Sequence, residues 1–348
     1  MPKAKQDIIQ KLQRLGKRLD LVLEHQRPAK DNSFEPIKAI VEEQWKQQRK
    51  ARVTRKKHPR QSESFQILEI PDYELVSPPF GQGSYGKVWL ARNAVGQWQA
   101  LKVVSLANFG RNADRYAEEF NGIRRYKPVS DKHPGLLRVE FLSRKRTEYF
   151  YYVMELGDSL EPGWESVPAN YKPRDLVSER TRAPGRRLPV RECLRIGIEI
   201  TAALEFLHRQ GLTHRDIKPQ NIIFVNGRPK LTDIGLIAEI RSIDQERTRV
   251  QTPGFMPPPP ERTGTPQADI HGLGMVLYVL STGRKPALFP EIATTLVQER
   301  NPEFFALNPI ILKACHPETA QRYRSAAEML DALKTAQSAQ DQLRDLSK

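Results

Sequence analysis

The sequence predicts an α+β fold of two lobes, a smaller one built on an antiparallel sheet with one helix and a larger one that is mainly helical. Three observations support this prediction. The length of 348 residues favours two folded units. Short strand-like runs separated by turn residues fill 65–156, whereas 157–336 contains longer apolar stretches with helical periodicity. A basic, partly helical extension of 1–64 precedes both lobes, and a tail of 337–348 follows them.

The extension is set apart by its charge. Residues 1–64 hold 17 Lys and Arg against 8 Asp and Glu, a net charge of +9 within a chain total of +15. Apolar residues between Ile8 and Val22 recur at spacings of three and four, which predicts a short amphipathic helix. The basic run in 49–60 could bind nucleic acid or an anionic surface, but we favour a solvated linker.

Composition favours a soluble protein of the cytoplasm. The only two cysteines, Cys193 and Cys315, lie in apolar helical contexts, which predicts reduced core thiols rather than a disulfide or a metal site. No apolar run approaches the ~18–20 residues that a membrane-spanning helix needs. The first residues also lack the apolar stretch of a signal peptide.

The small lobe begins with two strands, 73–76 and 87–91, joined by a glycine-rich turn, and a third strand covers 98–104. The pattern Gly-x-Gly-x-x-Gly also occurs in dinucleotide-binding folds, where it opens a helix, but here an alternating strand follows the last glycine. Glycines let backbone N–H groups approach phosphate oxygens closely, so the turn is predicted to lie over phosphates. The turn consists of Gly81, Gln82, Gly83, Ser84, Tyr85 and Gly86.

The third strand carries Lys102 among apolar residues. A lysine there could face solvent, but after a phosphate-binding turn we expect it to reach phosphates and to be paired, because an unpaired buried charge is costly. The partner is expected from the next helix, 112–126, where Glu118 and Glu119 both qualify. We choose Glu119 because Ile123 then lies one turn later on the same inward face.

Two further strands, 138–142 and 149–154, complete the predicted antiparallel sheet. The segment 158–188 is rich in Pro, Arg and Glu and is predicted to be an exposed connector. Helices are predicted over 188–208, from its apolar face, and over 268–278, which is predicted to be buried.

The densest group of reactive side chains lies in 212–235, between the two predicted helices. A buried strand, 222–225, and a return strand, 230–232, are joined by an Asn-Gly turn typical of a two-residue hairpin. The hairpin brings Asn221 and Asp233 together, as two oxygen ligands of magnesium require. The motif side chains that precede the first strand are His214, Arg215, Asp216, Lys218 and Asn221.

Taken together, these motifs resemble the eukaryotic-type protein kinase family, in its bacterial Ser/Thr branch, over about residues 68–336. The resemblance implies a bilobal kinase fold, ATP and Mg²⁺ as cofactors, and proteins as substrates that accept phosphate on Ser or Thr. It implies that the glycine-rich turn and Lys102 hold the phosphates while Glu119 orients Lys102. Val88 and Ala100 would enclose the adenine.

The same resemblance implies roles around the hairpin. Asp216 matches the catalytic base, Lys218 the lysine that bridges the γ-phosphate, and Asn221 and Asp233 the two magnesium ligands. The remaining matches are Met154 as gatekeeper, Glu155 and Gly157 in the hinge, Asp269 as a brace of the catalytic loop, and Glu261 with Arg322 as a buried ion pair.

Two departures from the family pattern stand out. Ile234 replaces phenylalanine after Asp233, a change that keeps an apolar side chain and from which we expect no loss of activity. The proline run of 257–260 puts two extra residues between Thr252 and Glu261 and stiffens the wall expected to meet the substrate. Sites of autophosphorylation are expected within 233–261, at Ser242, Thr248 or Thr252.

Other classes of function stay open. A pseudokinase scaffold would use the fold and the extension for partner binding, but it would normally lack Lys102, Asp216 or Asp233, and all three are present. A small-molecule phosphotransferase of related fold is disfavoured by the glycine-rich turn, Lys218 and the Glu261–Arg322 pair.

Overall fold

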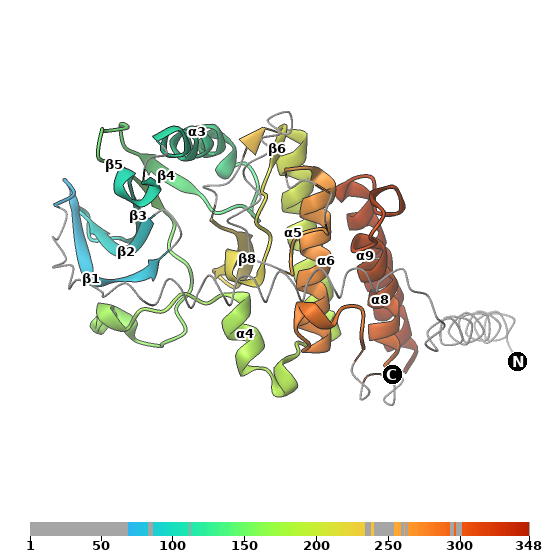
Figure 1. Cartoon of the computed structure of the whole chain (residues 1–348). Coiled ribbons are helices and arrows are strands. Elements are labelled where there is room, and N and C mark those ends of the chain that lie inside the picture. Colours follow the sequence, from blue (N-terminus) through green and yellow to red (C-terminus); the bar gives the residue numbers. More distant parts are fainter. Residues whose placement is uncertain are drawn as a thin grey trace, which may run out of the picture.

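The computed structural model describes residues 69–82, 86–110, 113–233, 238–239, 254–258, 261, 264–292, 296 and 301–347. In these ranges the chain forms the two predicted lobes, with a sheet and one α-helix on one side and a group of packed helices on the other (Figure 1). The extension of 1–64 lies outside the described residues, as do Gly83, Ser84 and Tyr85 of the turn and the three proposed phosphorylation sites. The predicted limits of the extension, lobes and tail stay predictions.

The small lobe is a five-stranded antiparallel sheet in the order β1-β2-β3-β5-β4. The helix α3 (Ala113–Ser130) packs on one face, where Ile123 and Tyr126 are buried together with Phe150 of the sheet. The strands are β1 (Tyr73–Gln82), β2 (Gly86–Asn93), β3 (Trp98–Ser105), β4 (Val139–Leu142) and β5 (Tyr149–Met154).

The first strand is longer than its pattern predicts. The alternation ends at Val76, but β1 continues to Gln82 through Pro78 and Pro79, and its register against β2 shifts between Val76 and Gly81. Proline lacks an N–H for the ladder and is tolerated at an edge, which is the position of β1 in this sheet.

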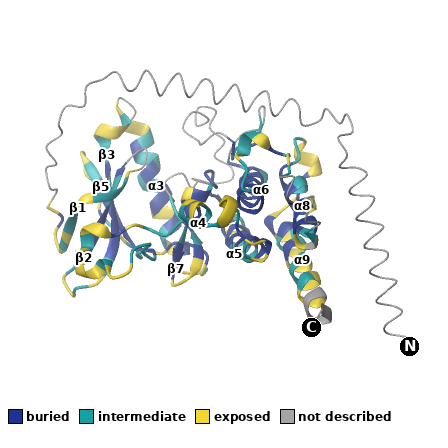
Figure 2. Cartoon of the chain, turned by 90° about the horizontal axis from the view of Figure 1, so that it is seen from below, coloured by how far each residue is buried: buried dark blue, intermediate teal, exposed yellow. Residues whose placement is uncertain are grey.

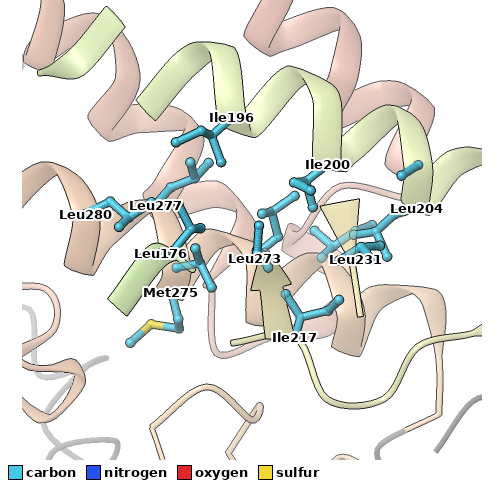
Figure 3. Close-up of a cluster of buried hydrophobic side chains, with 14 of the residues drawn as sticks. Leu176, Ile196, Ile200, Leu204, Ile217, Leu231, Leu273, Met275, Leu277 and Leu280 are labelled. Carbon is cyan, nitrogen blue, oxygen red and sulfur yellow. The ribbon is translucent and has the colours of Figure 1, made fainter. Parts of the chain in front are cut away.

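The large lobe is built on α5 (Val190–Arg209) and α6 (Pro266–Thr282), with α8 (Pro302–Ala314) and α9 (Ala326–Ser347) beside them (Figure 1). Side chains of α5 and α6 interlock with Leu231 in one apolar cluster, drawn in Figure 3. Buried residues line the facing sides of these helices and of the sheet (Figure 2). Cys193 and Cys315 are buried free thiols in this core, as predicted.

The connector after the sheet differs from its prediction. It contains the helix α4 (Leu176–Arg182), and Leu176 is fully buried although the surrounding sequence is polar. The local cause is a capping box, in which the side chain of Asp175 accepts from Ser178 N and the hydroxyl of Ser178 accepts from Asp175 N. None of the described helices is both long and apolar enough to cross a membrane.

Candidate active site

The two expected metal ligands are placed by a hairpin, as the sequence predicts. Strands β7 (Ile222–Val225) and β8 (Arg228–Leu231) are antiparallel, and Val225 pairs with Arg228. Asn226 and Gly227 both have positive φ, at 52° and 73°, which a two-residue turn of this type requires. Thr232 N donates to Asn221 O at 2.9 Å, so the two ends of the hairpin are held together.

The loop before the hairpin is held from below by Asp269 of α6. Its carboxylate accepts from His214 N and Arg215 N, both at 2.8 Å, and His208 Nε2 lies 3.0 Å from Asp269 Oδ2. Burial raises the pKa of Asp269, but the hydrogen bond and charge of His208, with His214, outweigh it and leave this pKa below its ordinary value. The loop is thereby fixed although Arg215 has a positive φ of 72°.

Asp216 is buried and oriented by two close neighbours in the sequence. Lys218 Nζ lies 2.6 Å from Asp216 Oδ2, and Asn221 Nδ2 donates to the same oxygen at 2.9 Å and to Asp216 O at 2.8 Å. Both side-chain donors use one carboxylate oxygen. Among the residues that the structure describes, this arrangement leaves the other oxygen, Oδ1, as an acceptor for a hydroxyl proton.

Lys102 of β3 connects the sheet to the hairpin of the other lobe. Its Nζ lies 3.1 Å from Asp233 Oδ1 and 3.9 Å from Oε1 of Glu119, which is buried on α3. Burial alone would lower the pKa of Lys102, but the nearby charges, with Asp233 first, raise it well above its ordinary value. The charge of Lys102 in turn lowers the pKa of Asp233, so both groups are ionised at neutral pH. Of the two candidate glutamates, Glu119 is the one whose carboxylate is found near Lys102 Nζ.

The residues expected around a nucleotide base lie on neighbouring strands. Ala100 is paired with Leu90 on one side and with Met154 on the other, and Val88 is opposite Lys102. Gly86 has a packing reason to be glycine that the sequence did not reveal, because a Cβ there would lie 2.3 Å from the carbonyl oxygen of Val103.

The hinge is fixed by contacts that the sequence did not indicate. The carboxylate of Glu155 accepts from Lys230 Nζ at 2.6 Å and from Arg138 N at 2.8 Å. A Cβ on Gly157 would lie 3.2 Å from Ile223 Cδ1 and 3.3 Å from Phe224 O, so this part of the hinge packs closely on β7. Glu155 therefore anchors the hinge to the large lobe through its side chain.

The side chains at the hairpin fit a magnesium ion that is shared with phosphates. Among the described residues no group of three or more His, Cys, Asp or Glu side chains forms a complete protein site. Mg²⁺ typically takes one or two protein oxygens and completes its shell with phosphate oxygens and water. Asn221 directs its amide nitrogen to Asp216, which leaves its oxygen as a ligand, and the side chain of Asp233 is 36% exposed.

The predicted Glu261–Arg322 ion pair is present, with Arg322 Nη1 2.6 Å from Glu261 Oε2 and the Arg322 side chain fully buried. Arg322 Nε also donates to His316 O at 2.6 Å. Nearby, burial and the charge of Arg322 lower the pKa of His271 to about 3, so this histidine is neutral. His271 and His208 were not predicted to belong to the site, although both lie within predicted helices that flank the reactive group.

Comparison with known proteins places the chain among kinases. Residues 75–341 match the protein kinase domain family. CBL-interacting protein kinase 4 of Oryza sativa subsp. japonica is 32% identical over 225 residues, which cover 62% of this chain and 45% of that protein. Serine/threonine-protein kinase PrkC of Bacillus subtilis (strain 168) is 28% identical over 294 residues, 78% of this chain and 40% of that protein. The chain thus spans less than half the length of these two relatives.

Proposed function

The chain belongs to the protein kinase family, and from this premise we propose that it transfers the γ-phosphoryl group of ATP to Ser or Thr hydroxyls of proteins. One observation supports this proposal above the others. Lys102 from the sheet meets Asp233 from the hairpin at 3.1 Å, while Lys218 and Asn221 orient Asp216 in the loop before the hairpin. These are the side chains that phosphoryl transfer needs for positioning and charge neutralisation.

In this proposal the phosphates are held from the small lobe. Lys102 is kept charged by its acidic neighbours and is directed into the site, with Glu119 behind it. Backbone N–H groups of the glycine-rich turn would approach the same phosphates. From the large lobe, Asn221 and Asp233 would hold Mg²⁺, which when bound would neutralise negative charge on the phosphate oxygens.

Asp216 would orient the substrate hydroxyl and accept its proton. Because Asn221 and Lys218 both bind Oδ2 of Asp216, the carboxylate is oriented before substrate arrives. Lys218 would have a second role. Its ammonium, which lies beside Asp216, would stabilise the charge on the group being transferred. Lys218 is the residue that the resemblance connects with Ser and Thr as acceptors.

Three further proposals accompany the activity. The two buried free thiols fit a reducing compartment, so we place the protein in the cytoplasm. Autophosphorylation is proposed within 233–261, and the basic run in 49–60 is proposed as a linker rather than a nucleic-acid site; most of the first segment and all of the second lie outside the described residues.

The activity is tested by incubating the protein with Mg-ATP labelled at the γ-phosphate, with and without a generic basic protein as substrate. We expect label on Ser or Thr in the wild type and none in Asp216→Asn, which keeps the shape of the side chain but removes the base. Wild-type protein that binds ATP by calorimetry and transfers no label would refute the proposal and favour the pseudokinase scaffold.

A further inference from the structure

The segment between the sheet and α4 is a loop fixed to the large lobe at its base. Leu160 N donates to Lys172 O and Arg174 N donates to Asp158 O, both at 2.8 Å, so the loop closes on itself like a hairpin. The carboxylate of Asp158 accepts from Asn226 N at 2.7 Å and from Gly227 N at 2.8 Å. The base of the loop is therefore attached to the β7–β8 turn.

The far part of this loop reaches the small lobe, where it passes below β1 and β2 (Figure 1). Trp164 of the loop meets Trp98 of β3 at a centroid distance of 5.7 Å. The ring centroid of Tyr171 lies 5.0 Å from that of Trp164 and 4.8 Å from that of Phe80 of β1, and both contacts are edge-on. We call these four residues, Phe80, Trp98, Trp164 and Tyr171, the aromatic bridge.

Tyr171 connects the bridge to the hinge. It is buried, and its hydroxyl donates to Gly157 O at 3.1 Å. Burial raises the pKa of Tyr171, so the hydroxyl stays a hydrogen-bond donor at any physiological pH. One ring thus contacts the strand that leads into the glycine-rich turn and is fixed to the hinge at the same time.

Phe80 is the residue directly before Gly81, the first glycine of the turn. Tyr171 packs against Phe80, so the loop contacts β1 directly before the turn. The distance between this end of β1 and the hinge therefore depends on the loop. A separate contact between the lobes is the Lys102–Asp233 pair, and its two charges are the ones that phosphates and metal would engage. The aromatic bridge is apolar and does not depend on these charges.

We propose that the aromatic bridge holds the glycine-rich strand close to the hinge, and that Trp164 and Tyr171 are positioning residues for nucleotide binding. The proposal rests on the proposed function for its ligand, although the aromatic contacts to the sheet are present without a nucleotide. A bridge that is intact only when the lobes are close favours the closed arrangement, to which a nucleotide binds more tightly. It should also slow the opening that releases ADP.

Trp164→Ala tests the bridge with two independent measurements. In the free protein, amide hydrogen exchange of a peptide covering 73–82 should become faster, while a peptide covering 222–231 should be unchanged. ADP affinity, measured by calorimetry without catalysis, should fall by about three- to tenfold, the range expected for the loss of an aromatic pair. The conservative Trp164→Phe should restore most of both signals.

Val167→Ala is the matched control, because Val167 lies in the same loop and is 51% exposed. Trp98→Ala should change both signals in the same direction but less, because Trp164 also contacts Tyr171, and the double variant should be no worse than Trp164→Ala, which already removes the Trp98–Trp164 contact. Exchange of 73–82 equal to that of Val167→Ala, or effects that simply add, would overturn the proposal. Faster exchange in a protein that binds no ADP would keep the restraint on β1 but refute the role in nucleotide binding, together with the proposed function.

Discussion

The residues of this site are positioned by contacts with residues that are either close or distant in the sequence. Asp216 is oriented by Lys218 and Asn221, which follow it within five residues. Lys102 instead meets Asp233, 131 residues later, across the two lobes. The first arrangement is a property of one short loop. The Lys102–Asp233 pair exists only when both lobes are folded. Local spacing in the sequence therefore indicates the contacts of Asp216 far more directly than this pair.

Glu119 allows a sharp test at the scale of one residue. Glu119→Gln removes the charge that lies 3.9 Å from Lys102 Nζ and is expected to lower kcat by about 10- to 100-fold, because small misplacements of a positioning group are costly. Phosphoryl transfer at saturating ATP is the measurement.

Glu118→Gln is the matched control, since Glu118 is the adjacent half-buried glutamate on α3. Its kcat should stay within about threefold of the wild type, as is usual for substitutions away from the reacting groups. Equal losses in the two variants would show that the assignment of Glu119 as the partner of Lys102 is wrong.

At the scale of elements, strong periodicity predicted the structure well and polar composition did not. The β7–β8 hairpin follows from an apolar run and an Asn-Gly turn, and α5 and α6 follow from their apolar faces. The connector after the sheet was expected to be exposed, but α4 and Tyr171 pack inward there. In that segment single apolar residues among many charges decide the fold, and their partners on distant elements are invisible to a local pattern.

In the hinge and the glycine-rich turn, too, the sequence indicates the residues of the site but not the contacts that hold them. The sequence indicates that Gly86 must be a glycine but not that Val103 O leaves no room for a Cβ. It places Glu155 in the hinge but not its ion pair with Lys230, which lies 75 residues away. Spacing identifies which residues belong to the site, whereas the contacts that hold them come from tertiary packing.

The buried Leu176 gives a test for the connector. Leu176→Ala should lower the free energy of unfolding by about 2–5 kcal/mol, the range for a large apolar side chain removed from a core. Val177→Ala, one residue along the same helix and 36% exposed, should change it by less than about 1 kcal/mol. Urea unfolding of both variants is the measurement, and equal stability would mean that α4 is not part of the core.

At the scale of the whole molecule, the large lobe acts as the fixed base of the site. Asp269 of α6 holds the loop that contains Asp216, and Arg322 holds Glu261 after the proline run. Pro258 O accepts from Glu261 N at 3.2 Å, so the ion pair also helps to hold Pro258. Because Gly272 of α6 packs against Ile217 and Phe255, the loop and the segment before Glu261 share one support.

Arg322→Lys is therefore expected to affect stability and the segment of 254–258 together. Lysine keeps the charge but cannot reproduce the bonds of Arg322 to Glu261, His316 O and Pro317 O at once, so a buried charge is left poorly paired. The free energy of unfolding should fall by about 3–5 kcal/mol, and amide exchange of 254–258 should become faster. Arg324→Lys, the same change at an exposed position two residues later, should leave both unchanged. Loss of stability without faster exchange in 254–258 would show that Arg322 supports the core but does not hold the segment before Glu261.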